Sequence, residues 1–597
     1  MHLRLLTLVL AAAAWIAAIH PAGAQLVLGD ARGTFLSGIY PGTTEDPLDW
    51  ANDASGAAIF YNSGYFGERA VIANVEGGYI WSGHEVFDRS AIPAGSPGAG
   101  AAITEFVAAP GVAGQTDYHA TMVGHILAGT GYVEGTAGGS LTYAGMGMAP
   151  FAQLWSGAIA TAFSETDIGS FETTTESVLA PYKAFFRGID GRKADVINSS
   201  WGGTGDGAAV SDEMLTLDAL ARENPTVAFV AAAGNGDAGQ VSSPGSGFNN
   251  IAVGSLGGAS FLTPSTFSSR GAADFFNPEE NDGAGLLHTG VRAAVDLSAP
   301  GEQLFLAAYL GPTGALQFLP EITQDPSPAG LYFINQDGTS FSAPTVAGGI
   351  ALLKDVAMGP AFALAEEAFD TRVIKSVLMA SSKSTDGWDN GQATATDGVV
   401  RTTQALDFAT GAGALDLTAA AGVYLLSGTR DVPGSTGGSI TASGWDFGTV
   451  APGQSNAYAF DSALTEGVIL TVSLNWFAGT SIDTSSDLGR GLTFTDLNLE
   501  IGLVNDGVFA TLVAESATVY NNTEFLRIGI PSDGQYAVRV TFHGLVYGPS
   551  PASPEPYGLA WATAQPVPEP STVLLFATAL AIACLCWQRR FRRPVAD

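Results

Sequence analysis

Short, mostly apolar runs alternate along residues 50–425 with longer segments in which apolar side chains recur at helical spacing. The runs at 70–75 and 230–233 are examples, and each leads within two residues into a polar side chain. Runs of this kind are typical of strands that are buried on both faces of a sheet. The alternation predicts a three-layer α/β domain over residues 50–425, with a mainly parallel central sheet and functional side chains at the carboxyl ends of its strands.

Residues 440–563 follow a different pattern. Apolar and polar positions alternate in the segments 468–474, 497–501 and 536–540, and Gly, Asn and Asp residues separate these segments. Period-two alternation between such turns is typical of an all-β sandwich. We therefore expect a second domain over residues 440–563, joined to the first by a linker at 426–439. It contains no recognisable catalytic set, and stability, substrate docking and adhesion remain open as its role.

The N-terminal residues have the three parts of a secretory signal peptide. Residues 1–24 begin with basic side chains, continue in an apolar stretch and end in the small residues Ala22-Gly23-Ala24. Cleavage is expected before Gln25, which leaves residues 25–49 as a short N-terminal segment. The protein is therefore expected to be exported through the inner membrane.

Residues 564–597 form a tail that also has three parts. The sequence Val-Pro-Glu-Pro at 567–570 precedes an apolar stretch at 571–587, which just reaches the length of a transmembrane helix, and an arginine-rich end that should remain cytoplasmic. The arrangement resembles the PEP-CTERM sorting signal of Gram-negative bacteria, which implies an exosortase-type processing enzyme as a partner. We expect a cell-surface or extracellular protein that the C-terminal helix anchors transiently in the membrane.

Composition narrows the possible partners. The chain has 24 Lys and Arg residues against 57 Asp and Glu residues, a net charge of −33, which argues against nucleic acid as a ligand. Both cysteines, Cys584 and Cys586, lie in the tail, so the exported part has no disulfide. Its stability must come from core burial. Bound Ca²⁺ stays open as a further stabilising ion with no assigned position, and we expect neither a cofactor nor a catalytic metal.

Residues 338–348 read Gly-Thr-Ser-Phe-Ser-Ala-Pro-Thr-Val-Ala-Gly and place Ser340 at the start of a predicted helix. The N–H groups at a helix start carry a partial positive charge that favours an oxyanion forming beside the hydroxyl. Pro344 is expected to lie in the first turn, where its missing N–H has no consequence. The whole run resembles the nucleophile segment of the subtilisin-like serine peptidases, the subtilases.

Two further segments resemble the same family. Residues 119–129 begin with His119 and continue in small and apolar residues, like the subtilase segment that carries the general base, although Ala120 stands where the family usually has glycine. Residues 230–236 form an apolar strand that leads into Asn235, and in subtilases this asparagine donates to the oxyanion together with the N–H of the serine. A serine needs such a base and such donors to attack a peptide carbonyl.

The third member of the expected triad departs from the family. Residues 64–76 align without gaps on the subtilase segment that leads to the catalytic aspartate, and in that register the aspartate position holds Glu76. A glutamate can accept the imidazole N–H in the same way. Its extra methylene needs room, and we expect the following Gly77-Gly78 pair to let the backbone retreat by that amount.

Two other acids are rivals for this role. Neither Asp88 nor Asp117 ends an apolar run. Asp117 stands two residues before His119, where it is expected to border the cleft.

The resemblance also implies residues that hold the substrate. Residues 195–203 resemble the strand that pairs with the substrate main chain and forms one wall of the cleft. Glycine-rich stretches at 90–115, 272–290 and 305–335 lengthen this chain relative to compact subtilases, and we expect them to rim the cleft. The implied substrate contacts are Ser200, Trp201, Gly202, Ala232 and Gly234.

Together these segments predict a serine endopeptidase that hydrolyses protein or peptide substrates through an acyl-enzyme. The predicted triad is Glu76, His119 and Ser340, with Asn235 in the oxyanion hole. The alternative is a catalytically impaired protein of the same fold that serves as a surface or matrix binding module. The intact segments around the histidine, the asparagine and the serine favour the enzyme.

Overall fold

The computed structural model describes most of the chain between residues 46 and 565. The predicted signal peptide, most of the segment 25–49 and the tail with its apolar stretch at 571–587 lie outside the described residues. Within the described range, the residues left out are 138–139, 165–168, 204, 238, 312–321, 324–331, 427–429, 436 and 552.

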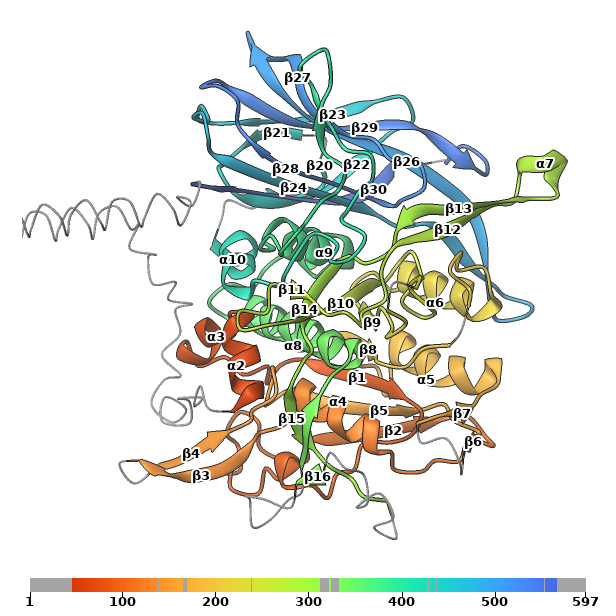
Figure 1. Cartoon of the computed structure of the whole chain (residues 1–597), viewed down its shortest axis with the longest axis vertical. Helices are drawn as coiled ribbons and strands as arrows, with labels where there is room; N and C mark the ends of the chain where they lie inside the picture. The colour runs from red at the N-terminus through yellow and green to blue at the C-terminus, as the bar shows by residue number, and fades with distance from the viewer. Residues whose placement is uncertain are drawn as a thin grey trace, which may run out of the picture.

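A mainly parallel sheet forms the centre of the first domain, as the alternation predicts (Figure 1). Strand β1 (Val71–Glu76) lies in its middle, parallel to both neighbours, β5 (Gln153–Ala158) and β8 (Val196–Ser199). Only the short edge strand β11 (Thr263–Pro264) runs antiparallel. The remaining strands of this sheet are β2 (Ile103–Ala108), β9 (Ala228–Ala232), β10 (Ile251–Gly257) and β14 (Leu297–Pro300).

Helices cover both faces of this sheet. Successive residues of β1 show this directly: Ile72 belongs to the core under α4 and α8, whereas Val71 and Ala73 belong to the core under α5 and α6. A strand buried on both faces needs apolar residues on both, which explains why its sequence shows no polar alternation. The helices are α2 (Pro47–Ala54), α3 (Ala58–Asn62), α4 (Tyr118–Ala128), α5 (Thr175–Arg187), α6 (Asp212–Glu223), α8 (Thr339–Met358), α9 (Thr371–Ala380), α10 (Leu417–Ala421), and the short η1 (Glu85–Phe87), η3 (Glu366–Phe369) and η4 (Gly422–Leu426).

The C-terminal region folds into two packed sheets around an apolar core of its own, the predicted sandwich. One sheet contains β21 (Gly437–Ile440), β23 (Ser455–Phe460), β25 (Gly479–Asp483), β26 (Leu488–Asn505), β27 (Val508–Ser516) and β29 (Tyr536–Tyr547). The other contains β20 (Arg430–Ser435), β22 (Gly444–Val450), β24 (Ile469–Trp476), β28 (Thr523–Gly529) and β30 (Glu555–Ala564). Two short strands from within residues 50–425, β18 (Ala393–Thr394) and β19 (Val400–Arg401), extend the first sheet next to β27.

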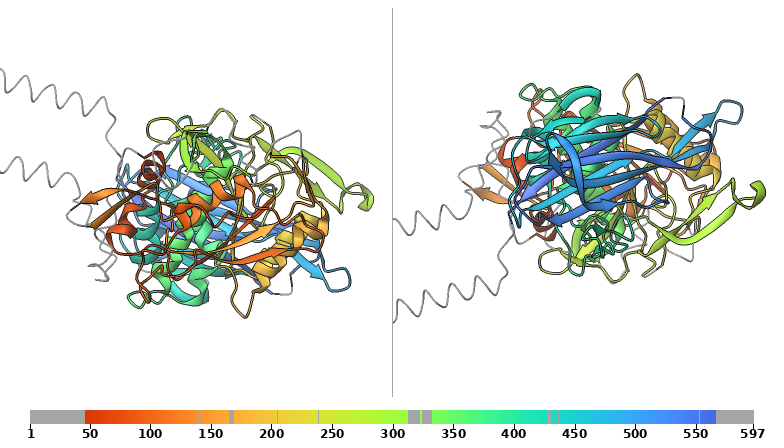
Figure 2. Two further views of the ribbon diagram at one scale, coloured as in Figure 1. Left: turned by 90° about the horizontal axis from the view of Figure 1, so that it is seen from below. Right: turned by 90° about the horizontal axis from the view of Figure 1, so that it is seen from above.

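The two domains share a tightly packed boundary. Figure 2 shows the sandwich covering one end of the first domain, and α9, all of whose residues are buried, packs against strands β24 and β30. Trp445 and Ala560 of the sandwich belong to the same apolar core as Val373 and Val377 of α9. The sandwich therefore completes the burial of α9.

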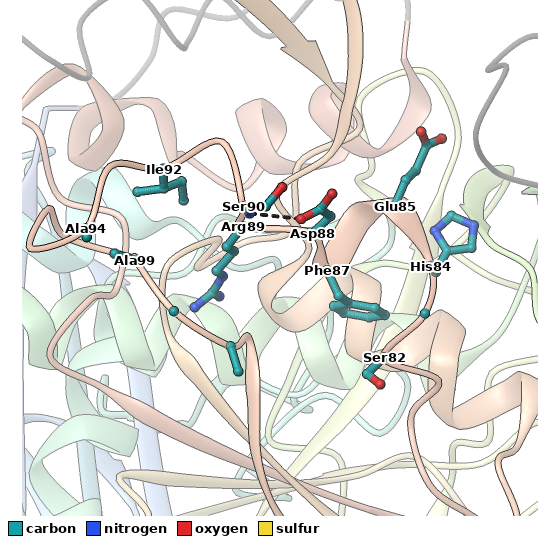
Figure 3. Close-up of a pocket in the computed structure, with 13 residues that line it drawn as sticks. Ser82, His84, Glu85, Phe87, Asp88, Arg89, Ser90, Ile92, Ala94 and Ala99 are labelled. Atoms are coloured by element: carbon teal, nitrogen blue, oxygen red, sulfur yellow. Dashed lines mark hydrogen bonds between the residues drawn. The ribbon is translucent and has the colours of Figure 1, made fainter.

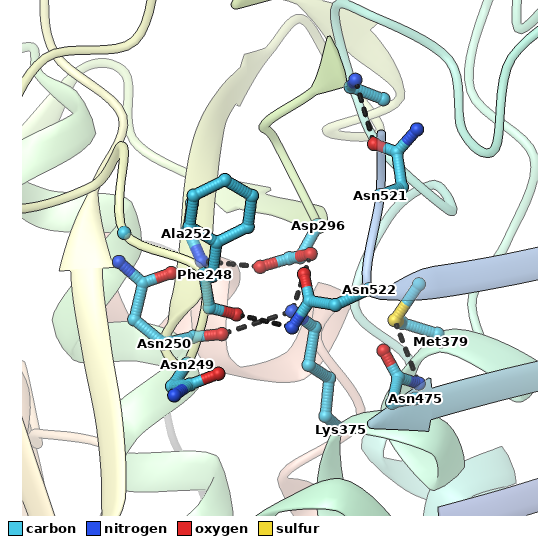
Figure 4. A network of polar contacts seen from close by, with 12 residues as sticks. Phe248, Asn249, Asn250, Ala252, Asp296, Lys375, Met379, Asn475, Asn521 and Asn522 are labelled. Carbon is cyan, nitrogen blue, oxygen red and sulfur yellow. Dashed lines mark hydrogen bonds and ion pairs between the residues drawn. The ribbon is translucent and has the colours of Figure 1, made fainter. Parts of the chain in front are cut away.

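Buried polar groups of the two domains form hydrogen bonds with each other across this boundary (Figure 4). The amide of Asn249 donates to the carbonyl of Ala478 at 3.1 Å and accepts its N–H at 2.8 Å. The side-chain amide of Asn522, in the sandwich, donates to the carbonyl of Phe248 in the first domain at 2.7 Å. A buried polar group is tolerated only when it has partners, so these contacts fix how the domains sit together.

The predicted loops at 90–115 and 272–290 do not simply rim the cleft. The first contains β2, an edge strand of the central sheet. The second forms a hairpin of β12 (Ala272–Asn277) and β13 (Leu286–Ala293), with α7 (Glu280–Gly283) at its projecting tip (Figures 1 and 2). Phe275 of this hairpin packs on Phe494 of the sandwich, with ring centroids 4.9 Å apart. Phe275 is therefore buried by apolar side chains of the sandwich and not by the first domain alone.

The remaining described strands are short and lie outside these sheets. They pair as β3 with β4, β6 with β7, and β15 and β16 with β17. Their bounds are β3 (Tyr132–Ala137), β4 (Ser140–Ala144), β6 (Ala162–Phe163), β7 (Phe171–Glu172), β15 (Leu304–Ala307), β16 (Ile322–Thr323) and β17 (Tyr332–Gln336).

Candidate active site

Glu76 is the last residue of the buried central strand β1, and its side chain contacts His119 on α4. One carboxylate oxygen, Oε2, lies 3.0 Å from Nδ1 of the imidazole. The other, Oε1, accepts the main-chain N–H of Ser200 at 3.0 Å. The carboxylate is 1 % exposed, so both oxygens are held in place by protein groups.

The two glycines after Glu76 are closely surrounded by neighbouring groups. A Cβ atom at Gly77 would lie 3.0 Å from the ring of Phe171, and one at Gly78 would lie 2.4 Å from the carbonyl oxygen of Gln115. Neighbouring side chains and backbone occupy the space that any larger residue would need. The pair lets these groups approach the end of β1, and the retreat of the backbone to make room for Glu76 stays a prediction.

The rival acid Asp117 is engaged as the N-cap of α4. Its carboxylate accepts the N–H of Ala120 at 3.2 Å, and its carbonyl accepts the hydroxyl of Thr121 at 2.7 Å. Aspartate is among the preferred N-cap residues because it satisfies N–H groups that the helix leaves unpaired. Asp117 thus positions the helix that carries His119 and borders the cleft.

The rival acid Asp88 is one of the residues around the cavity drawn in Figure 3. It lines a cavity of about 790 Å³ formed mainly by residues 82–101, and its exposed carboxylate accepts the N–H of Ser90 at 2.8 Å. These hydrogen bonds lower the pKa of Asp88. Of the three acids, Glu76 is the one that is hydrogen-bonded to the imidazole.

Ser340 is the second residue of α8 and is 8 % exposed. Its hydroxyl donates to the carbonyl of Ser200 at 2.9 Å, so in this rotamer the described hydrogen bond goes to the main chain and not to the imidazole. The ring of Phe341 lies 6.0 Å from that of His119. Ser340 is thus linked to His119 through Ser200, in the turn after β8, and Glu76, which contacts both Ser200 and the imidazole.

Pro344 departs from the expectation for the first turn. The helix begins at Thr339, which places Pro344 in its second turn. Proline there has no N–H to offer the carbonyl four residues earlier, which is that of Ser340. The proline therefore removes a helical hydrogen bond at the residue that carries the hydroxyl.

Asn235 follows the carboxyl end of β9, and the first residue of α8 holds its side chain. Its Oδ1 accepts both the N–H and the hydroxyl of Thr339 at 2.9 Å. That hydroxyl in turn accepts the N–H of Gly234 at 3.1 Å. Because donors occupy Oδ1, the amide orientation is settled, and Nδ2 lies on the side of Gly338, 3.6 Å from where its Cβ would be.

The charges of the site are coupled. Burial lowers the pKa of His119, but the charge and hydrogen bond of Glu76, with a smaller contribution from Asp117, outweigh it and raise the pKa overall. Burial raises the pKa of Glu76, against the imidazole and the N–H of Ser200, which lower it. A carboxylate beside the imidazole favours the imidazolium, the form that a general base reaches after taking a proton.

A cavity of about 300 Å³ opens next to His119, and three of the predicted substrate contacts line it: Ser200, Trp201 and Gly202. Ala232 and Gly234 are not among the residues that line this cavity; they lie on the strand and turn that lead to Asn235.

Other side chains around the site were not predicted from the sequence. Tyr118, Phe163 and Phe171 line the same cavity. The two phenylalanines come from strands of two residues each, too short to give a periodic signal. Ser242 was also missed: a Cβ at Gly202 or at Gly234 would come within 3.1 or 3.2 Å of its hydroxyl, so it lies between the two predicted substrate-binding segments.

Two features are absent from the part of the chain that the structure describes. No group of three or more His, Cys, Asp or Glu side chains there is arranged to hold a metal ion. None of the helices in that part is long and apolar enough to cross a membrane.

Comparison with known protein families shows the family to which this chain belongs. The sequence model of the subtilase family matches residues 106–413, which is just over half of the chain, and the protein belongs to this family of serine proteases. The PEP-CTERM protein-sorting motif matches residues 566–590. The family match begins after Glu76, so the case for that residue rests on the contacts described above.

Solved structures with a similar chain trace are distant in sequence. The serine protease of Aeromonas sobria is 15% identical, with 89% of this chain and 98% of that chain covered and a TM-score of 0.43. The prenylagaramide maturation protease PagA is 18% identical, with 61% and 96% covered and a TM-score of 0.38. No curated protein matches this chain.

Proposed function

We propose that the protein is an exported serine endopeptidase that cleaves peptide bonds through an acyl-enzyme. The observation that carries this proposal is the 3.0 Å contact between Glu76 and Nδ1 of His119, at the end of the sheet where Ser340 stands in the first turn of α8. Nδ1 must then carry the proton, which leaves Nε2 as the basic nitrogen of the neutral imidazole.

The remaining groups fit the steps of acyl transfer. Rotation of the Ser340 side chain away from the carbonyl of Ser200 would bring the hydroxyl to His119, which takes its proton as the oxygen attacks the substrate carbonyl. Nδ2 of Asn235 and the N–H of Ser340 would then donate to the oxyanion. Because Thr339 already holds Oδ1 of Asn235, the amide needs no reorientation during the reaction.

The termini support export and surface sorting. The PEP-CTERM motif at 566–590, together with the signal-peptide pattern at 1–24, supports passage through the inner membrane and recognition of the tail by an exosortase-type enzyme. On this proposal the C-terminal apolar stretch anchors the protein only until it is processed, and the substrate is a protein or peptide at the cell surface or outside the cell.

Two observations favour the alternative, a catalytically impaired binding module. The hydroxyl of Ser340 bonds to the carbonyl of Ser200, and the triad acid is a glutamate. A fluorophosphonate probe separates the two functions, because it labels only a serine that a base activates.

The test compares wild type with Ser340→Ala and Ser342→Ala. Ser342 is a matched control, since it is buried in the same helix two residues further on. Labelling and peptide hydrolysis in wild type and Ser342→Ala, and neither in Ser340→Ala, is the expected result. A folded wild-type protein that the probe leaves unlabelled would establish the impaired module instead.

A further inference from the structure

The cavity beside His119 has walls of aromatic side chains. Tyr118 of α4, Phe163 of β6, Phe171 of β7 and Trp201 after β8 line it, and all four are partly exposed. They come from separate segments of the chain, so the aromatic lining is a product of the tertiary fold. Aromatic faces carry a negative quadrupole and attract cations as well as apolar groups.

The aromatic walls are held in place by their own contacts. The indole N–H of Trp201 donates to the hydroxyl of Tyr182 at 2.9 Å. The rings of Phe163 and Phe171 pack together with centroids 6.1 Å apart, and both rest on the glycines that follow Glu76. A cavity with walls fixed in this way needs little reorganisation when a ligand enters.

The charged side chains that line this cavity favour a ligand with a positive charge. Glu76 and Asp117 line it, and no described lining residue is Lys or Arg. Both oxygens of Glu76 are already occupied by His119 and Ser200. Asp117 also accepts a protein N–H, that of Ala120, but it is not hydrogen-bonded to the imidazole, so it is the carboxylate whose charge can act on a ligand in this cavity. The whole chain, with a net charge of −33, also attracts cationic ligands over a longer range.

We propose that this cavity binds the side chain of a lysine or arginine in the peptide substrate, with its alkyl stem against the aromatic walls and its charged end towards Asp117. The proposal rests on the proposed function for the identity of the ligand as a substrate residue. Long basic side chains suit such a site because their stems are apolar and their ends are cationic.

The test measures peptide binding rather than cleavage, so that it does not depend on activity. Folded Ser340→Ala protein is titrated with fluorescent peptides in which lysine, or its uncharged isostere norleucine, is placed at each position in turn. At one position, lysine should bind about tenfold more tightly than norleucine, the size expected of a partly desolvated cation–π contact and one carboxylate.

Two variants in the Ser340→Ala background locate the effect. Asp117→Asn keeps an N-cap acceptor but removes the charge, and Phe171→Leu keeps an apolar wall but removes the aromatic face. Each should bring the lysine-to-norleucine ratio towards one. Asp88→Asn, which removes an exposed carboxylate outside this cavity, is the control that should leave the ratio unchanged.

Three outcomes would overturn the proposal: equal binding of the two peptides at every position, no binding of either, or a preference that survives both variants. Failure of the proposed function looks different. In that case wild type shows neither hydrolysis nor probe labelling, while the lysine preference of the Ser340→Ala protein stands.

Discussion

Replacing Glu76 by glutamine tests the part of the site in which this chain departs from its family. The carboxylate accepts two donors, the N–H of Ser200 and Nδ1–H of His119, each at 3.0 Å. An amide has one oxygen and one NH₂ group, so it can accept only one of the two donors. The N–H of Ser200 cannot change its role, and it should keep the oxygen. The NH₂ group then faces Nδ1 and forces the imidazole into the tautomer that carries its proton on Nε2.

That tautomer cannot take a proton from Ser340, so turnover should fall by about 10⁴-fold, equivalent to about 5.5 kcal/mol of transition-state stabilisation. Glu76→Asp should also lose activity, because its shorter side chain cannot keep both 3.0 Å contacts while Gly77 and Gly78 hold the backbone against neighbouring groups.

The assay is kcat for a fluorogenic peptide, corrected for the active fraction by probe titration. Thermal unfolding checks that each variant is folded. Asp88→Asn is the control for removing an acid, and it should keep wild-type turnover. Unchanged turnover in Glu76→Gln would refute the reasoning, and a rise in Glu76→Asp would mean that the glutamate is a damaged aspartate and not an adapted residue.

Three further predictions follow from contacts of the described residues. Asn235→Ala should lower kcat by about 100- to 1000-fold with little change in KM, because the amide acts on the oxyanion; a raised KM at constant kcat in steady-state kinetics would contradict this role. The pKa of His119 is raised from 6.5, and the imidazole acts as a base only when it is unprotonated. The midpoint of the acid limb of kcat/KM should therefore lie above pH 6.5. A midpoint below 6.5 in the measured pH profile would count against this environment. Asn249→Ala should lower the free energy of unfolding by about 2–4 kcal/mol, because it leaves the buried N–H and carbonyl of Ala478 unpaired. Chemical denaturation measures this free energy. An unchanged value would mean that these two hydrogen bonds across the domain boundary add little stability.

Much of the fold and part of the site could be predicted from local patterns in the sequence. Apolar runs predicted a parallel sheet because strands buried on both faces need apolar residues on both, and the residues of β1 do face both cores. The helix starts that carry His119 and Ser340 were predicted from the residues that follow them, because helical spacing depends on neighbours within a few residues. Pro344 was predicted in the first turn of its helix and lies in the second, because its place depends on the exact residue at which the helix begins.

The tertiary structure decided which distant groups meet. The sequence left three acids as candidates, and the packing of β1 against α4 brings Glu76 to the imidazole, while Asp117 caps the helix and Asp88 lies in a separate loop. The aromatic cavity, with Phe171 close to Gly77, likewise has no local signature. The physical reason is common to these cases. Periodicity and capping are properties of a few consecutive residues, whereas a contact between segments far apart in the chain depends on how whole elements pack and on which polar groups that packing leaves to be satisfied.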